Sequence, residues 1–368
     1  MNVIFLVPSL IKAGPINVVY DIIRHIDRDR FCPIVFSLMS PSSHRDVTDA
    51  FKKLGIVVKT FAYTHWNLEL RTNVVSRAIQ QELEPYPGCI VHGHGYHPTL
   101  IMAELELSRS LVTIHNICKE DFLYQKGFFT GCYMSFRYMA ALRKISVSIV
   151  ISDYMADFYR RRLSGKDVRT IYNGIDTSVY NLDVDKIHVK KNSKSIKRCV
   201  VSGRFSKRKN HLSILRSLKK SRRNDFVLFF LGIGEFFERC RSEVSGDSRF
   251  QFEGYQMDIL PYLQSADFYI SASLSEGLPL GVLEAVSMGI PTMLSNIPPH
   301  LEILEATCQP TELSFNPSDE DEMLRVFESN LDVIFDRTGI ASAARRCFSA
   351  KVMGEEYSHV YHQIMNNL

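Results

Sequence analysis

Short apolar runs alternate with stretches of helical apolar spacing twice along the 368-residue chain, and no other feature constrains its fold as strongly. In such a pattern each apolar run is a buried strand, and the following helix carries the chain back to begin the next parallel strand. The expected strands are Asn2–Val7, Pro33–Ser37, Ile56–Lys59, Cys89–His92, Leu111–Ile114, Val147–Ile151 and Arg169–Ile171, then Arg198–Ser202, Phe226–Leu231, Phe250–Glu253, Phe268–Ile270, Thr292–Leu294 and Leu313–Phe315. The sequence therefore predicts an α/β protein with two doubly wound sheets.

A polar stretch separates the two halves. Asp, Asn, Lys and Ser predominate from about Thr177 to Lys197. We interpret the stretch as a linker, because no aromatic residue interleaves with its lysines as a nucleic-acid surface requires. The expected domains are 1–180 and 198–350, joined by a linker at 181–197 and followed by a helical segment at 351–368. Two such domains facing each other form a cleft at the carboxyl ends of their strands, where ligands bind in folds of this kind.

Composition is that of a globular protein, with 45% hydrophobic residues, 23% charged residues and a formal net charge of +4. This charge suits an anionic membrane surface but is too weak to indicate nucleic acid. The eight cysteines form no C-x-x-C pair and are expected to be free thiols in a reducing compartment. We read the apolar N-terminal run as a strand rather than a signal peptide, and no apolar window is long enough for a spanning helix. The expected location is the cytoplasm, with peripheral membrane contact left open.

One stretch, 273–285, joins an expected strand to an expected helix and carries two carboxylates eight residues apart, Glu276 and Glu284. Gly277 permits a sharp turn, and Pro279 suits the first helical position because its missing N–H costs nothing there. The free N–H groups of a helix start at Leu278–Leu280 favour an anion. An anion site with carboxylates indicates a ligand that has both phosphates and hydroxyls, such as a nucleotide sugar.

A second strand end, in 203–209, places four cations within six residues. Arg204 follows Gly203 directly, and Lys209 offers a point charge on a longer stem. A solvated basic helix start is the alternative, but cations there oppose the helix dipole, which favours a bound anion.

Weaker signals come from glycines at other strand ends. Gly232 belongs to a G-x-G that is by itself often only a tight turn. Gly254 and Tyr255 also follow a strand and are candidates for the edge of a base or ribose pocket. Gly14 precedes a helix expected at about 17–26, where it permits close backbone approach to a ligand or merely a turn.

Histidines cluster at strand ends in the first half. His92, His94 and His97 have short spacing that admits a zinc site, but nearby carboxylate partners are absent and we favour hydrogen-bonded histidines. His115 ends the next strand, where it either bonds a substrate hydroxyl or satisfies backbone carbonyls. The stretch 122–144 mixes aromatic and basic residues and is either a membrane-contacting surface or an ordinary packing helix.

Together these motifs resemble the family 4 retaining glycosyltransferases of the GT-B fold, of the bacterial surface-polysaccharide type. The most specific element is the E-x7-E motif from Glu276 to Glu284, and the 203–210 block, the histidine strand ends and the turn at 173–176 follow in the family's order. The resemblance covers almost the whole chain. It implies two Rossmann-like domains facing across a cleft, with the C-terminal helix crossing back to the first domain.

The resemblance also implies roles for the residues. Arg204 and Lys209 hold the donor diphosphate with the helix start at 278–281, and Gly14 lies under it. Glu284 bonds the ribose, Glu276 faces the transferred sugar, and His115 touches the sugar or the acceptor. Nothing resembling a D-x-D motif is expected to coordinate a metal, and neither a metal nor a cofactor is expected.

The implied reaction is transfer of a hexose or N-acetylhexosamine from a UDP-linked donor to a glycan or lipid-linked glycan, with an α-linkage. A GT-B nucleotide-sugar epimerase and a non-catalytic sugar-nucleotide-binding protein are the alternatives. The sequence does not select the donor sugar.

Overall fold

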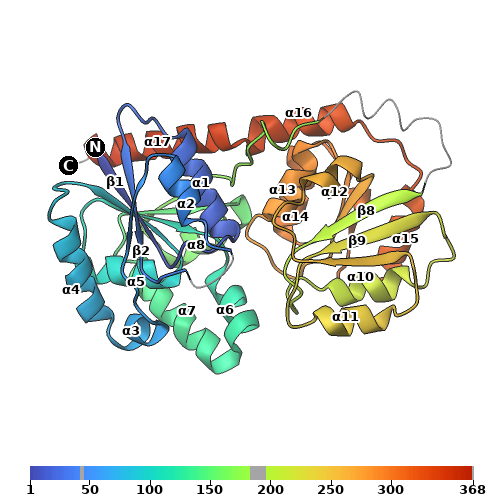
Figure 1. The fold of residues 1–368 in the computed structure, drawn as a ribbon, viewed down its shortest axis with the longest axis horizontal. Helices are drawn as coiled ribbons and strands as arrows, with labels where there is room; N and C mark the ends of the chain where they lie inside the picture. Colours follow the sequence, from blue (N-terminus) through green and yellow to red (C-terminus); the bar gives the residue numbers. More distant parts are fainter. Residues whose placement is uncertain (42–44, 183–195, 367–368) are drawn as a thin grey trace. The chain divides into compact units, whose positions relative to one another are not determined.

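The structure is a computed structural model that describes residues 1–41, 45–182 and 196–366. It divides into two compact units (Figure 1). Unit 1 comprises Met1–Gly174 and Ala350–Leu368, and unit 2 comprises Ile175–Ser349. The change of unit therefore comes at Gly174, a few residues before the end that the sequence indicated for the first domain. Most of the expected linker, 183–195, lies outside the described residues.

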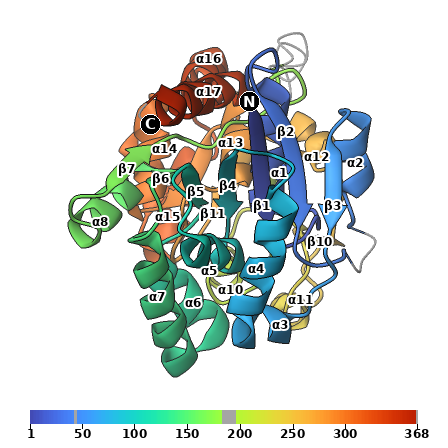
Figure 2. The same ribbon diagram turned by 90° about the vertical axis from the view of Figure 1, so that its left-hand side faces the viewer.

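Unit 1 is built on a seven-stranded parallel sheet in the order β3-β2-β1-β4-β5-β6-β7 (Figure 2). Its strands are β1 (Asn2–Val7), β2 (Cys32–Ser37), β3 (Val57–Thr60), β4 (Ile90–His94), β5 (Ser110–Ile114), β6 (Val147–Val150) and β7 (Asp167–Thr170). Its helices are α1 (Gly14–His25), α2 (Thr48–Lys53), α3 (His65–Leu70), α4 (Thr72–Leu83), α5 (Tyr96–Leu105), α6 (Cys118–Lys126), α7 (Phe128–Leu142), α8 (Asp153–Arg162) and α17 (Ala350–Asn366). The strand order reverses between β1 and β4, which is the switch point where doubly wound sheets bind ligands.

Unit 2 repeats the plan with a six-stranded parallel sheet in the order β10-β9-β8-β11-β12-β13. Its strands are β8 (Lys197–Ser202), β9 (Phe226–Leu231), β10 (Phe250–Gly254), β11 (Phe268–Ser271), β12 (Thr292–Ser295) and β13 (Ser314–Phe315). Its helices are α10 (His211–Leu218), α11 (Phe237–Glu243), α12 (Leu260–Ser265), α13 (Leu280–Ser287), α14 (Pro298–Ala306), the 3-10 turn η2 (Thr311–Leu313), α15 (Glu320–Asn330) and α16 (Arg337–Phe348). The switch point of this sheet lies between β8 and β11.

The central strands are apolar throughout because helices cover both faces of each sheet. In β1 every residue after Asn2 is buried. Helix α1 turns one face to the sheet, with Ile16, Val19 and Ile23 buried, and Pro15 occupies its first turn without loss of a hydrogen bond. All the expected strands are present, and the predicted fold class of two Rossmann-like doubly wound domains is confirmed.

The C-terminal helix α17 belongs to unit 1 and packs on α1, as the resemblance implied. Its Tyr357 and Tyr361 are fully buried. No helix in the described residues is long and apolar enough to cross a bilayer. The eight cysteines are all free thiols.

Candidate active site

In unit 2, glycines at the carboxyl ends of β8, β9 and β10 allow the backbones of these strand ends to approach closely. Gly203 and Gly232 both have φ of +141°, and a Cβ on Gly232 would lie 2.0 Å from the Gly203 carbonyl oxygen. The Gly232 N–H in turn donates to the Gly254 carbonyl at 2.7 Å. The loop after β8 is tied to the loop after β9 because the Phe205 N–H donates to the Ile233 carbonyl. The structure thus brings three predicted donor-binding glycines to one sheet edge.

Helix α13 begins beside this edge. Its first intrahelical bonds run from Val282 and Leu283 to the Pro279 carbonyl, so Pro279 is the N-cap and Leu280 the first helical residue. The prediction that Pro279 is the first helical residue is wrong by one position, because its ψ of 116° is extended. A Cβ on Gly281 would lie 2.6 Å from both the Ser202 and Tyr269 hydroxyl oxygens, so glycine lets the helix start press against the end of β8.

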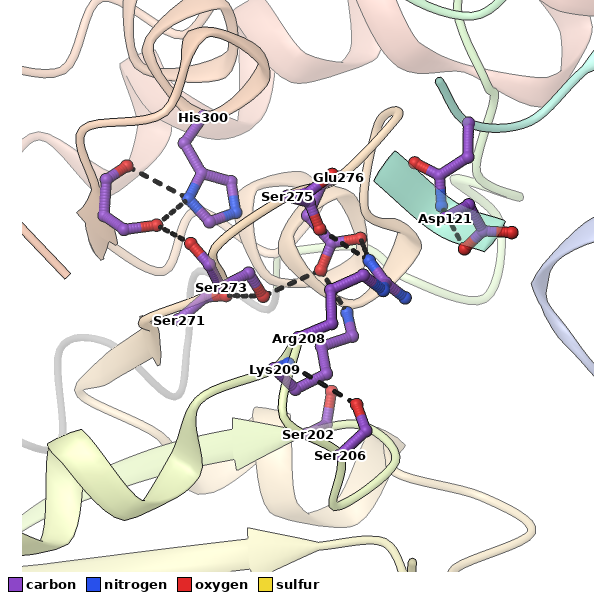
Figure 3. Close-up of polar contacts among 12 residues, drawn as sticks. Asp121, Ser202, Ser206, Arg208, Lys209, Ser271, Ser273, Ser275, Glu276 and His300 are labelled. Atoms are coloured by element: carbon purple, nitrogen blue, oxygen red, sulfur yellow. Dashed lines mark hydrogen bonds and ion pairs between the residues drawn. The ribbon is translucent and has the colours of Figure 1, made fainter. Parts of the chain in front are cut away.

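The carboxylate of Glu276 is the centre of the polar cluster that Figure 3 shows. Its side chain is only 6% exposed. It accepts from Lys209 Nζ at 2.5 Å, from Arg208 Nη1 at 2.6 Å and from Ser273 Oγ at 2.7 Å. Buried charges of this kind persist only when they are paired and hydrogen-bonded.

Burial acts to raise the pKa of Glu276, but the Lys209 and Arg208 cations overcome it and hold the pKa well below its usual range. Burial lowers the pKa of Lys209, although Glu276 acts to raise it. The carboxylate therefore stays ionised, with each oxygen already engaged by a strong donor.

Arg208 was missed by the sequence interpretation, which selected Arg204 and Lys209 from the same basic block. Residues 207–209 form a turn whose Arg208 carbonyl accepts from the Leu274 N–H, and this turn brings two consecutive side chains onto one carboxylate. Arg204 is exposed, and within the described parts of the chain no side-chain partner is found for it. The stem of Lys209 passes over Gly203. The abundance of cations was the only signal that pointed to Arg208.

Two neutral histidines lie behind the cluster. Burial lowers the pKa of His300 to about 4 and that of His211 to about 3. His300 Nδ1 lies 2.9 Å from Ser295 Oγ (Figure 3), and His211 stacks on Phe205. The positive charge beside Glu276 therefore comes from Arg208 and Lys209 alone among these four basic side chains.

The remaining predicted donor-binding residues of unit 2 surround the same region. Glu284 is half-buried on α13, and its charge adds to burial in raising the pKa of Tyr269. Gly277, Leu278 and Pro279 are buried in the turn before α13, and Leu280 is half-buried. Tyr255 follows β10 and is also half-buried. Their contacts with a nucleotide stay predictions.

In unit 1, His92 is held by the C-terminal helix. Its Nδ1 lies 2.8 Å from the Tyr361 hydroxyl and its Nε2 lies 2.7 Å from Thr113 Oγ1, which in turn lies 2.8 Å from the Tyr357 hydroxyl. Both ring nitrogens of His92 are thus occupied. His97 bonds Glu69 of α3 instead. The zinc alternative does not fit this arrangement, and in the described ranges no three His, Cys, Asp or Glu side chains gather as a metal site.

His94 and His115 form a separate pair at the ends of β4 and β5, with His94 Nδ1 3.0 Å from His115 Nε2. Burial lowers the pKa of His115 to about 4, so the ring is neutral near pH 7. Gly14, the other predicted ligand-binding residue of unit 1, is the exposed first residue of α1.

Two family models match the chain and together cover most of it. Residues 14–179 match the model described as Glycosyltransferase Family 4, and residues 196–331 match Glycosyl transferases group 1. With the GT-B architecture and the E-x7-E site, these matches show the class. The chain belongs to the family 4 glycosyltransferases.

Individual relatives agree. The O-antigen biosynthesis glycosyltransferase WclY of Escherichia coli is 21% identical over 381 residues, covering 100% of this chain and 99% of that protein. An Escherichia coli UDP-Gal:alpha-D-GlcNAc-diphosphoundecaprenol alpha-1,3-galactosyltransferase is 30% identical over 142 residues, 35% of this chain and 37% of that protein.

Solved structures show the same fold. Sucrose-phosphate synthase from Thermosynechococcus elongatus superposes with a TM-score of 0.80 at 16% identity, covering 100% of both chains. HepE of Anabaena in complex with UDP superposes with a TM-score of 0.77 at 16% identity, covering 99% of this chain and 100% of that one.

Proposed function

We propose that this glycosyltransferase transfers a hexose or N-acetylhexosamine from a UDP-sugar to a glycan or lipid-linked glycan in surface-polysaccharide synthesis, with retention and an α-linkage. The observation that carries the proposal is the buried Glu276 carboxylate, held by Arg208 and Lys209 beside the start of α13. The choice of UDP as the nucleotide draws support from the relative named for UDP-galactose and from the UDP complex of HepE. The name of WclY supports the O-antigen pathway.

The leaving group of this reaction is a nucleoside diphosphate whose charge grows in the transition state. Lys209, the exposed Arg204 and the N–H groups at the start of α13 supply positive potential to this region. No acidic residue lies in the first turn of α13 to cancel its dipole. We assign the diphosphate to this region and the charge-balancing task to these groups rather than to a metal.

The bonding of Glu276 bears on how the configuration is retained. A carboxylate with three donors and a depressed pKa is a weak nucleophile, because those bonds must be given up as a covalent adduct forms. Its negative charge can instead stabilise the positive charge that develops at the anomeric carbon. We therefore favour front-side attack, with the departing phosphate oxygen taking the proton of the acceptor hydroxyl.

A panel of nucleotide sugars tests the function. In the presence of EDTA, one UDP-sugar is expected to raise the melting temperature and to release UDP, faster when an acceptor glycan is added. Interconversion of the donor sugar without any acceptor requirement would identify an epimerase. Binding of one donor without hydrolysis or transfer would identify a binding protein.

A lipid-linked acceptor requires the enzyme to reach a membrane, and unit 1 has a surface suited to it. Trp66 and Leu70 of α3 and Phe129, Tyr133 and Phe136 of α7 are 59 to 87% exposed. We call these five side chains the aromatic face. An ion pair from Arg137 to Glu69 at 2.8 Å joins the two helices.

The aromatic face is a candidate for contact with an anionic bilayer. Exposed apolar side chains gathered on adjacent helices mark an interaction surface, and aromatic rings prefer the headgroup level. Exposed Arg71 and Lys126 lie at the ends of the neighbouring helices, where they can pair with anionic lipids. For the stretch 122–144 the sequence left open a membrane-contacting surface or an ordinary packing helix, and we extend the first alternative to include α3.

Co-sedimentation with vesicles that contain anionic lipid at low salt tests this surface. The variant with Trp66→Ser, Phe129→Ser and Phe136→Ser is expected to bind at least about tenfold more weakly, since burying one such side chain contributes roughly 1.5–3 kcal/mol. Ile334→Ser is the matched control, because Ile334 is 87% exposed on unit 2. Equal binding of wild type and triple variant counts against the assignment.

A further inference from the structure

The contact between His94 and His115 constrains where the protons of both rings lie. His94 is the last residue of β4, and His115 directly follows the neighbouring parallel strand β5. The distance between His94 Nδ1 and His115 Nε2 is 3.0 Å. His94 is only 1% exposed. Its ring packs on those of His92 and Phe5, with centroids 4.2 Å and 6.1 Å away. Since both nitrogens of His92 bond other residues, His92 offers no donor or acceptor to His94.

Both rings are neutral near pH 7. Burial lowers the pKa of His94 well below its usual value, and it lowers that of His115 to about 4. Two neutral imidazoles share one proton at their contact, so either His94 Nδ1–H donates to His115 Nε2 or the reverse.

The far nitrogen of His94 distinguishes the two arrangements. His94 Nε2 is buried and has no hydrogen-bond partner in the described residues. If His115 were the donor, Nε2 would carry a buried N–H without an acceptor, and buried orphaned N–H groups are rarer than under-satisfied acceptors. If His94 is the donor, its Nε2 is only a bare lone pair. Donation by His94 therefore has the smaller desolvation penalty.

We propose that His94 donates from Nδ1 to His115 and thereby fixes His115 as the tautomer with its proton on Nδ1. His94 is a positioning residue, and His115 becomes a hydrogen-bond donor rather than a base. His115 is half-buried, and its Nδ1 bonds no residue in the parts of the chain that the structure describes, so this N–H is available to a substrate oxygen.

The catalytic consequence of this tautomer rests on the proposed function, because only in sugar transfer does the His115 N–H have a substrate oxygen to bind. A ring that donates to a hydroxyl or phosphate oxygen does not remove the acceptor proton. That proton then passes to the departing phosphate oxygen as the new glycosidic bond forms and the bond from the anomeric carbon to the diphosphate breaks. His115 holds its partner oxygen in place and stays neutral throughout.

The proton positions are measurable without any substrate. Long-range proton–nitrogen NMR of the full chain with ¹⁵N-labelled histidine separates protonated from unprotonated ring nitrogens, and His115→Asn assigns the His115 signals by their loss. We expect Nδ1 of His115 to be protonated and Nε2 not. A protonated Nε2 in the wild-type chain overturns the proposal, whether or not the enzyme turns over a sugar donor.

A matched pair of variants tests the role of His94. The side-chain amide that His94→Asn introduces can place an N–H near the position of Nδ1, whereas His94→Leu fills similar volume without a donor. We expect His94→Leu to lose the single His115 tautomer and to lower kcat at least about tenfold, with the donor KM nearly unchanged, and His94→Asn to restore both. Equal kcat for the two variants overturns the positioning role. UDP binding and the melting temperature report whether each variant is folded, and if His94→Leu does not fold, the wild-type spectrum decides.

Discussion

Arg208 and Lys209 are consecutive in the chain, yet both side chains reach the carboxylate of Glu276. In a strand consecutive side chains point to opposite faces, and in a helix they lie about 100° apart, so neither pattern predicts the convergence. The turn at 207–209 causes it. Residue spacing could therefore identify the basic block and both glutamates, but it could not say which cation pairs with which acid.

The diphosphate assignment predicts the effect of removing its cations. Arg204→Ala and Lys209→Ala are each expected to lower turnover of the UDP-sugar about 100-fold or more, because each removes positive potential that grows in value toward the transition state. Lys207→Ala is the matched control, since Lys207 is an exposed cation of the same turn. Steady-state UDP release measures all three. Near wild-type rates for both Arg204→Ala and Lys209→Ala would show that the diphosphate does not bind in this region.

The ion pairs of Glu276 predict a pH-dependent contribution to stability. Its pKa is held below the unfolded value, so its contribution is present above pH about 4.5 and is lost as the pH falls through the folded pKa. Glu276→Gln leaves Arg208 and Lys209 buried without an anion and is expected to cost about 3 kcal/mol at pH 7. Urea unfolding of the ligand-free proteins measures the difference in unfolding free energy between wild type and Glu276→Gln. This difference should become smaller below pH 4.5. A difference that is constant or grows on acidification contradicts the assigned charge state.

At the scale of elements, helix α13 connects the two glutamates to the sheet. The turn before it holds Glu276, its first N–H groups are the proposed donors to the diphosphate, and Gly281 fits against the end of β8. The position of this helix could be predicted from the strand-to-helix pattern. The contact of Gly281 with Ser202 and Tyr269 could not, because those residues come from two other strands.

Gly281→Ala tests that contact. The new methyl group would meet two hydroxyl oxygens at 2.6 Å, so the helix start must move away from β8. We expect a loss of about 1–3 kcal/mol in unfolding free energy and at least about tenfold weaker UDP binding. Ser287→Ala at the other end of α13 is the control, since its buried hydroxyl has no hydrogen-bond partner in the described residues. Tight UDP binding by Gly281→Ala, measured by calorimetry, would show that the helix start does not hold the nucleotide.

At the scale of the molecule, the alternation of strands and helices was sufficient to predict both sheets. The pattern is local, because a fully buried parallel strand must be apolar throughout, and β1, β9 and β11 are largely so. Contacts between distant segments were not predictable in the same way. The link from Tyr361 to His92 spans 269 positions, and an ion pair from Arg137 to Glu69 joins α7 to α3.

The same limit explains the histidines. Their spacing at 92, 94 and 97 admitted a zinc site, whereas the structure assigns His92 to the α17 tyrosines, His94 to His115 and His97 to Glu69. The three histidines are close in the sequence, but the fold places each of them in a different environment. The central claim that we propose is chemical: the enzyme transfers a sugar with retention and without a metal.

Proton NMR of the reaction as it proceeds tests that claim most directly. The full chain is incubated with the UDP-sugar selected by the panel, an acceptor glycan and EDTA, and the anomeric signal of the first product is recorded. We predict that UDP is released and that the first product carries the α-configuration of the donor. A β-linked first product, or transfer only after a divalent metal is added in excess of EDTA, would contradict the account.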